Sequence, residues 1–227
     1  MRLAKFLAKA GVCSRRQAET FILKGMVLVN GERAEITTPV GERDVVLFEG
    51  KPVQLIPDTR TILFHKPRGV ICTTSEKERP NLQDCLQLTE RLYPIGRLDK
   101  DSEGLLLLTN DGDLALKLTH PRYEHEKEYE VTVAQKIAGE SISQLAQGIE
   151  LEDGPTLPAK VILKGPCTFR IVLKEGRNRQ IRRMCEALGL RVKKLIRLRS
   201  GSLNLDVKVG EFRDLSPSEL ERLLKPV

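Results

Sequence analysis

The sequence predicts an α+β fold with a mixed, largely antiparallel sheet. Strand-like and helix-like stretches follow one another at irregular intervals along the chain. A regular strand–helix–strand rhythm, which would indicate a parallel sheet, is missing. The pattern of helix-like and strand-like segments also changes after the turn-rich residues 56–60, Ile-Pro-Asp-Thr-Arg. We therefore expect two domains, residues 1–55 and 61–227, joined by a linker at 56–60.

Two helices and a small sheet are expected in the first domain. Residues 2–10 carry apolar side chains at helical spacing, and Gly11 ends that segment. Ser14-Arg15-Arg16-Gln17 is a capping box, which predicts a second helix from there to Lys24-Gly25. The small sheet would have strands at 27–29 and 44–48, with Asn30-Gly31 as a hairpin turn.

The second domain is expected to hold the larger sheet. Leu105–Leu108 is apolar enough to be a buried strand, and Lys127–Val133 alternates as a strand with one buried face does. Ser216-Pro217-Ser218-Glu219 is typical of a helix start. The other expected elements are strands at 62–64, 70–72, 161–163, 169–173 and 195–198, and helices at 81–86, 113–118, 139–147 and 179–188.

Composition indicates a polyanionic partner. The formal net charge is +7 and the pI about 9.2, which favours nucleic acid over an acidic membrane surface. Aromatic residues make up only 4% of the chain, so rows of aromatic platforms for single strands are disfavoured. The N-terminal segment MRLAKFLAKAG has lysines within its apolar pattern. We therefore expect neither a signal peptide nor a membrane anchor, and we place the protein in the cytoplasm.

Cysteine and histidine usage indicates neither a metal site nor a disulfide framework. The five cysteines are an odd number, and none belongs to a C-x-x-C pair. Only three histidines are present. We expect no metal and no cofactor, and we interpret the cysteines as small core residues in a reducing compartment.

The exposed faces of the two N-terminal helices are predicted to be basic. Arg15 and Arg16 would lie in the first turn of the second helix, beside free backbone N–H groups, where a phosphate could meet both. A solvated surface is the alternative, but two adjacent basic helices favour a nucleic-acid contact. The basic residues on these faces are Arg2, Lys5, Lys9, Arg15, Arg16 and Lys24.

Asp99 is the central residue of the stretch GRLDKDSEGLLLLTNDG, residues 96–112. Four charges crowd Arg97–Asp101, shortly before the apolar run Leu105–Leu108. A helix cap or a loop salt bridge would be the ordinary role of such an aspartate. A carboxylate at the edge of a buried strand is partly desolvated, however, and needs a cationic partner to stay ionised.

Cationic partners for Asp99 are abundant in residues 175–184, EGRNRQIRRM. The segment 177–199 contains nine basic residues and one acid. A purely structural salt-bridge role would call for more carboxylates nearby, so an RNA-backbone contact is favoured over a solvated face. The arginines expected on the polar face of the helix are Arg179, Arg182 and Arg183.

Residues 2–7, 11–18 and 25–31 together resemble the S4 RNA-binding module. The order helix, Ser-Arg-Arg, helix, Gly-x-Val-x-Val-Asn-Gly is long enough to be specific, and the match covers almost all of residues 1–50. The resemblance implies binding of structured RNA through the helix pair.

The rest of the chain resembles the RNA pseudouridine synthases. Gly96–Leu106 is similar to their active-site motif. Residues 66–69, 127–131 and 175–184 are similar to their first strand–turn, tyrosine and basic motifs. More narrowly, the resemblance is to the bacterial ribosomal-RNA branch that includes RsuA, RluB, RluE and RluF. The residues of the motifs are most similar to those of the RluF group.

This resemblance implies isomerisation of a uridine in ribosomal RNA to pseudouridine, without metal or redox cofactor. Asp99 would be the nucleophile, and Arg182 would pair with it and keep it charged. Tyr129, by default a core residue of its strand, would stack on the target base and act in removing the C5 proton. Arg97 would help to evict the uridine from its helix.

The implied partner is ribosomal RNA, of the large subunit by preference, with small-subunit RNA or a tRNA as alternatives, and a monomer is expected. The sequence fixes neither the modified position nor the route, whether attack of Asp99 at C1′, addition to C6 or a glycal. The residues expected to contact RNA are Arg2, Lys5, Ser14, Arg15, Arg16, Lys24, Arg97, Lys100, Arg177, Arg179 and Arg183.

Two other functions compete with this one. A non-catalytic, S4-type ribosome-associated protein would share the basic faces but would not need Asp99. A nucleoside or glycoside hydrolase would use Asp99 and Asp101 as paired carboxylates. We expect the two side chains to point to opposite faces of a strand, which disfavours such a pair.

Overall fold

The computed structural model describes residues 1–225 except 57, 76, 89 and 120–124. The chain forms two compact units. Met1–Arg60 belongs to the first unit, together with the short segments 89–92 and 110–112, and the other segments from Thr61 onward form the second. Within the described ranges, no helix is long and apolar enough to cross a bilayer.

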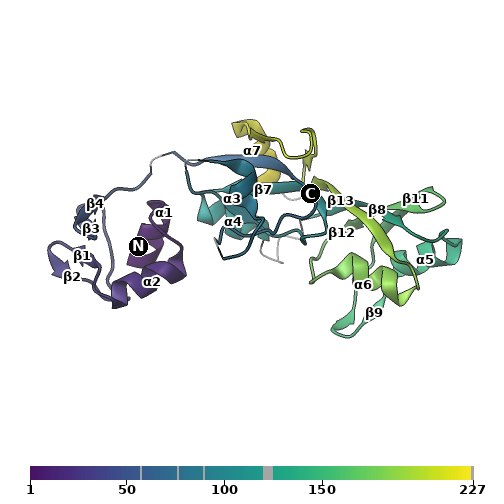
Figure 1. The fold of residues 1–227 in the computed structure, drawn as a ribbon, viewed down its shortest axis with the longest axis horizontal. Helices are drawn as coiled ribbons and strands as arrows, with labels where there is room; N and C mark the ends of the chain where they lie inside the picture. The colour runs from purple at the N-terminus through teal and green to yellow at the C-terminus, as the bar shows by residue number, and fades with distance from the viewer. Residues whose placement is uncertain (57, 76, 89, 120–124, 226–227) are drawn as a thin grey trace. The chain divides into compact units, whose positions relative to one another are not determined.

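In the first unit, two helices share one apolar core with a four-stranded sheet of order β2-β1-β3-β4 (Figure 1). The predicted capping box is present, because Ser14 Oγ accepts the Gln17 N–H at 3.2 Å and Gln17 Oε1 accepts the Ser14 N–H at 3.0 Å. The hairpin turns at Asn30 and Gly31, which have φ of 54° and 86°. The elements are α1 (Leu3–Lys9), α2 (Arg15–Leu23), β1 (Val27–Val29), β2 (Glu32–Arg33), β3 (Val46–Phe48) and β4 (Lys51–Val53).

The second unit is built on a nine-stranded sheet. Its main path runs β11-β12-β8-β13-β7-β5-β15, while β14 pairs with β13 and β6 with β7. Among these described strands, β13 with β7 is the one parallel pair, so the sheet is mixed and largely antiparallel, as predicted. The strands are β5 (Thr61–Lys66), β6 (Tyr93–Ile95), β7 (Glu103–Thr109), β8 (Lys127–Val133), β11 (Lys160–Gly165), β12 (Thr168–Leu173), β13 (Val192–Ser200), β14 (Leu203–Asn204) and β15 (Phe212–Asp214), with β9 (Glu150–Leu151) and β10 (Gly154–Pro155) in a separate hairpin.

Helices pack on this sheet in two groups that Figure 1 shows toward different ends of the second unit. α5 (Gly139–Gln147) and α6 (Gln180–Ala187) share an apolar core with β8, β12 and β13. α4 (Gly112–Thr119) and α7 (Pro217–Leu224) share another with β5 and β7. A short helix, α3 (Leu82–Leu86), precedes β6.

Gly104 makes the parallel contact between β7 and β13 possible. It lies opposite Arg197, and a Cβ at position 104 would be 2.3 Å from the Arg197 carbonyl oxygen and 2.5 Å from its nitrogen. Its φ of +117° is also a conformation that other residues rarely adopt. The two halves of the sheet therefore meet at Gly104, where no side chain separates β7 from β13.

The structure differs from the sequence-based expectation mainly in short strands. β2, β4, β6, β9, β10, β14 and β15 were not predicted, because two or three residues are too few to show a period. The strand expected at 70–72 is wrong, since only an isolated bridge from Ile71 to Asn81 forms there.

Candidate active site

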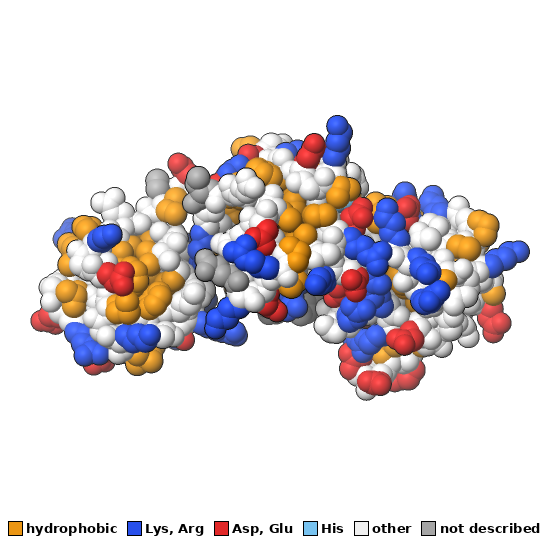
Figure 2. All heavy atoms as spheres, in the orientation of Figure 1, with side chains coloured by type: hydrophobic (Ala, Val, Ile, Leu, Met, Phe, Trp, Pro, Cys, Tyr) orange, Lys and Arg blue, Asp and Glu red, His pale blue; other side chains and the backbone are white. Residues whose placement is uncertain are grey.

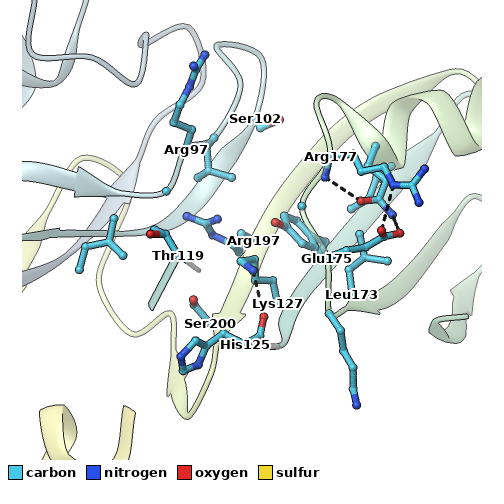
Figure 3. Close-up of a pocket in the computed structure, with 18 of the residues that line it drawn as sticks. Arg97, Ser102, Thr119, His125, Lys127, Leu173, Glu175, Arg177, Arg197 and Ser200 are labelled. Atoms are coloured by element: carbon cyan, nitrogen blue, oxygen red, sulfur yellow. Dashed lines mark hydrogen bonds and ion pairs between the residues drawn. The ribbon is translucent and has the colours of Figure 1, made fainter. Parts of the chain in front are cut away.

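A cavity of about 610 Å³ opens in the second unit, lined by residues from both helix groups. The loop 96–102, between β6 and β7, borders one side, and the segment 173–181 borders another (Figure 3). We call these two segments the rim. Residues of β8 and β13 also line the cavity, and we call these two strands its floor. Asp99 and Tyr129 therefore face a common space.

Asp99 lies in a turn before β7 rather than on a strand. The expectation that Asp99 and Asp101 point to opposite faces of a strand was therefore wrong, and residues two positions apart on a strand would in any case share one face. The separation of the two carboxylates has a different basis, since Asp99 lines the cavity whereas Asp101 is exposed and is not among the lining residues.

The backbone around Asp99 is anchored from three directions. The fully buried Lys66 donates from Nζ to the Ser102 carbonyl at 2.8 Å. The Gly69 N–H donates to the Lys100 carbonyl at 2.7 Å, and the Ser102 N–H to the Asp99 carbonyl at 3.0 Å. Burial lowers the pKa of Lys66, so holding this ammonium in the core is costly. The motif at 66–69 thus supports the loop that carries Asp99.

Two guanidinium groups face the Asp99 carboxylate. Arg179 Nη1 and Arg182 Nε each lie 3.9 Å from Asp99 Oδ2. Arg182 also donates from Nη2 to the Asp101 carbonyl at 3.0 Å and to Ser102 Oγ at 3.3 Å. Burial and the neighbouring Arg179 lower the pKa of Arg182, yet a guanidinium stays charged at neutral pH. The Nε atom is buried and has no hydrogen-bond partner among the described residues.

Tyr129 lies on the cavity floor. It is half-buried, packs against the core that α5 and α6 share with the sheet, and is paired with Arg197 of β13. The same side chain therefore has both the core role that is the default for a strand tyrosine and a place in the cavity that Asp99 lines.

Comparison with known proteins identifies the family. Residues 60–187 match the family model described as RNA pseudouridylate synthase, and residues 1–46 match the S4 domain model. The chain belongs to the RNA pseudouridylate synthase family. Pseudouridine synthases are isomerases, so the non-catalytic S4-type alternative is not favoured.

Full-length relatives support this membership. The chain is 43% identical to the Dual-specificity RNA pseudouridine synthase RluF of Escherichia coli K12, over 99% of this chain and 79% of that protein. It is 43% identical to the Ribosomal large subunit pseudouridine synthase B of Bacillus subtilis 168, over 98% and 95%. A crystal structure of a pseudouridylate synthase superposes with a TM-score of 0.73 at 33% identity, over 98% and 99% of the two chains.

The residues of this pseudouridine synthase that were predicted to contact RNA fall into two sets, one in each unit. Arg97 and Lys100 are exposed on the loop of Asp99, and Arg97 lines the cavity (Figure 3). Basic side chains gather in a band over the second unit, where Figure 1 shows β13 and α6 (Figure 2). In the first unit, Arg2, Arg15, Arg16 and Lys24 are exposed, and Lys5 and Ser14 are half-buried.

Arg177 and Arg183 have partners within their own unit. Arg183 makes a bidentate pair with Asp153, at 2.8 and 3.0 Å. Arg177 donates to Glu175 at 3.0 Å and to backbone carbonyls of residues 153–155. These two side chains hold the loop of the β9–β10 hairpin. This role was not predicted, because the loop is distant along the chain.

Two basic residues of the cavity were also missed. Arg197, only 4% exposed, and Lys127 both line the cavity. From the sequence, Arg197 was expected only as part of a basic stretch and Lys127 only as part of the tyrosine motif. The place of Lys127 could have been predicted from strand periodicity, because it lies two residues before Tyr129 on one strand and therefore shares its face. Within the described residues, no group of three or more His, Cys, Asp or Glu is placed to hold a metal ion.

Proposed function

We propose that this pseudouridine synthase isomerises a uridine in ribosomal RNA, of the large subunit by preference, with Asp99 as the nucleophile. The observation that carries the proposal is the position of Asp99. It lies in an anchored turn, lines a cavity with Tyr129, and has two guanidinium groups 3.9 Å from one carboxylate oxygen. The name of the B. subtilis relative, which covers nearly the same length, supports the choice of RNA.

The reaction requires few groups. The N1–C1′ bond of uridine breaks, the base turns, C5 bonds to C1′, and the proton lost from C5 is balanced by one gained at N1. No external reagent is consumed, so an anionic group beside the sugar and a cavity that retains the base are enough. Arg179 and Arg182 stabilise the Asp99 carboxylate by Coulomb attraction, which a partly desolvated site strengthens.

Access to the base requires that it leave its stack, which costs a few kcal/mol and least in loops or distorted helices. We propose that Arg97, exposed on the rim, supports the flipped nucleotide and that the Tyr129 ring stacks on the base in the cavity. In this proposal Arg182 positions Asp99 and assists in its ionisation.

The S4 unit supplies the remaining affinity in this proposal. Arg15 and Arg16, exposed in the first turn of α2, would bind the RNA backbone, and Lys100 and Arg179 would do so near the cavity. Residues 1–55 would serve RNA binding and 61–227 catalysis, with a linker at 56–60. We further propose that the protein acts as a monomer in the cytoplasm.

One observation favours an alternative in which the enzyme modifies a second RNA besides large-subunit ribosomal RNA. The E. coli relative is named a dual-specificity enzyme. Small-subunit ribosomal RNA and tRNA are therefore to be mapped together with large-subunit RNA.

The test is chemical mapping of pseudouridines in RNA from cells with and without this gene. We expect one or more sites to disappear from large-subunit RNA and to return with the wild-type gene. Asp99→Ala should fail to restore them while binding the RNA with nearly unchanged affinity. The matched control, Asp101→Ala, removes an exposed neighbouring carboxylate and should restore them. Product formation by Asp99→Ala, or release of free uracil by the wild type, would contradict the proposal.

A further inference from the structure

Two cations lie on the cavity floor without a role in the function proposed above. Lys127 and Tyr129 are two residues apart on β8, and Arg197 of β13 is directly paired with Tyr129, so all three share one face of the sheet. Figure 3 shows Lys127 and Arg197 next to each other at the centre of the cavity lining. The positive charge of Arg197 contributes, after burial, to lowering the pKa of Lys127.

These two charges have no carboxylate partner among the described residues. Arg197 donates from Nε to the Leu105 carbonyl at 2.6 Å, and Lys127 from Nζ to the His125 carbonyl at 3.0 Å. Burial, and then the Arg197 charge, lower the pKa of Lys127 to about 8. Two like charges held together in a largely buried place are unfavourable unless an electron-rich group joins them.

The nearby acids are engaged elsewhere. The two carboxylates that line the cavity are Asp99, which faces Arg179 and Arg182, and Glu175, which accepts from Arg177 at 3.0 Å. The acids on either side of Lys127 in the chain, Glu126 and Glu128, pair with Arg199 instead. A negatively charged or electron-rich partner for Lys127 and Arg197, beyond their two backbone carbonyls, would therefore come from a ligand.

We propose that Lys127 and Arg197 bind the carbonyl oxygens of the target uracil and stabilise the negative charge that the base acquires during isomerisation. The inference rests on the proposed function. When the N1–C1′ bond breaks, its electron pair stays on the base. The base then carries negative charge over N1, O2 and O4, while C1′ bonds to Asp99. When C5 bonds to C1′, the bond between C1′ and Asp99 breaks, the Asp99 carboxylate is regenerated and the base loses its negative charge. Transfer of the C5 proton to N1 then completes the isomerisation. Donors fixed beside such oxygens act without reorganisation.

Burial favours the base over a phosphate as the group recognised. The rim cations are open to solvent, with the Arg179 side chain 47% exposed and Arg97 and Lys100 also exposed. The floor cations are not, since Arg197 is 4% exposed and Lys127 is mostly buried. A flipped nucleotide inserts its base and leaves its phosphates outside, so the floor meets the base and the rim meets the backbone.

The experiment compares Lys127→Met with Lys127→Arg under single turnover, on a stem–loop RNA that contains the mapped uridine. Lys160→Met, which removes an exposed lysine of the edge strand β11, is the matched control. We expect Lys127→Met to lower the rate constant at saturating RNA by roughly 10²-fold, the usual loss for one donor to a developing anion. The Kd for the RNA and the Tm should not worsen, Lys127→Arg should recover much of the rate, and Lys160→Met should match the wild type.

The pH profile supplies an independent readout. At subsaturating RNA, the wild-type rate constant should fall as pH rises through about 8, because Lys127 loses its proton, and Lys127→Arg should remove that fall. The groups that face Lys127 from its surroundings are Arg197, Tyr129 and His125. The pKa of His125 is lowered by burial and by Lys127, so the imidazole is neutral throughout this range.

The possible outcomes separate this inference from the proposed function. A weaker Kd with an unchanged saturated rate would show that Lys127 binds phosphate, and an unchanged rate with a lower Tm would show a structural role. Either result overturns the inference. The proposed function would still stand if the wild type forms pseudouridine and Asp99→Ala does not. Absence of pseudouridine in the wild-type reaction would instead overturn the proposed function.

Discussion

At the scale of single residues, Asp99 and Lys127 show how one cavity keeps a carboxylate and an ammonium group for different uses. Asp99 faces two guanidinium groups at 3.9 Å, whereas Lys127 faces Arg197. The first arrangement is stabilising and the second is not. Unfavourable charge placement that packing tolerates is a frequent sign of a functional site.

Lys127→Met should therefore stabilise the protein while it reduces activity. The pKa of Lys127 is lowered to about 8 in the folded state from 10.5, so the unfolded chain binds the proton more tightly. The cost of the buried charge is fully present below pH 8 and disappears as pH rises toward 10.5. We expect the free energy of unfolding at pH 7 to increase by about 1–3 kcal/mol, given ~1.4 kcal/mol per pKa unit.

The measurement is urea unfolding of wild type and variant at pH 7 and pH 10. The stability difference should shrink at the higher pH, because the wild type gains stability as Lys127 deprotonates. A variant that is less stable at pH 7 would show that Lys127 contributes packing rather than strain.

At the scale of elements, the parallel pairing of β7 with β13 joins the loop of Asp99 to the strand of Arg197. β7 continues directly from that loop, and Gly104 allows β13 to approach without a side chain between them. Arg197 then crosses back to the Leu105 carbonyl at 2.6 Å. This strand junction thus sets the position of one rim segment, the loop 96–102, relative to the β13 part of the floor.

Gly104→Ala should disrupt this junction. Its Cβ would lie 2.3 Å from a backbone oxygen, and the φ of +117° is strained for alanine. We expect a loss of unfolding free energy of about 2–4 kcal/mol, from strain and overpacking together. Product formation should fall even at temperatures where the variant is folded, because β13 must move and carry Arg197 with it.

Gly165→Ala is the matched control, since a Cβ there would meet nothing within 4 Å. Thermal unfolding and single-turnover assays of both variants check the prediction. Equal Tm values for the two alanine variants would mean that the junction is not tightly closed.

At the scale of the whole molecule, two compact units with basic surfaces divide the affinity for RNA in our proposal. Contacts to phosphates release counterions, so each contributes to the salt dependence of binding. The S4 unit and the catalytic unit should therefore be separable by salt titration, without knowledge of how the units are arranged.

Arg15→Ala with Arg16→Ala should weaken RNA binding and reduce the slope of log K against log salt concentration by roughly 1–2. The single-turnover rate at saturating RNA should stay unchanged, because both residues belong to the first unit. Filter binding between 50 and 200 mM salt, a range over which phosphate contacts change affinity by about 10³–10⁵-fold for a full interface, measures the slope. An unchanged slope would show that α2 does not contact the RNA backbone.

The sequence by itself determined the local features of this protein. Capping boxes at Ser14 and Ser216, the hairpin turn at Asn30-Gly31 and the buried strand around Leu105–Leu108 were all predictable, because each depends on residues a few positions apart. The same holds for the motif around Asp99, because its consecutive residues indicated the family.

Only the tertiary structure decided which distant residues meet. The approach of Arg179 and Arg182 to Asp99 joins segments 80 and 83 residues apart along the chain. The ion pair of Arg183 with Asp153 gives a predicted RNA-binding residue a partner within its own unit. The presence of Lys127 and Arg197 on the floor depends on strand register and on the glycine junction at Gly104. Long-range pairing arises from packing and backbone hydrogen bonds between distant strands, and no local pattern encodes it.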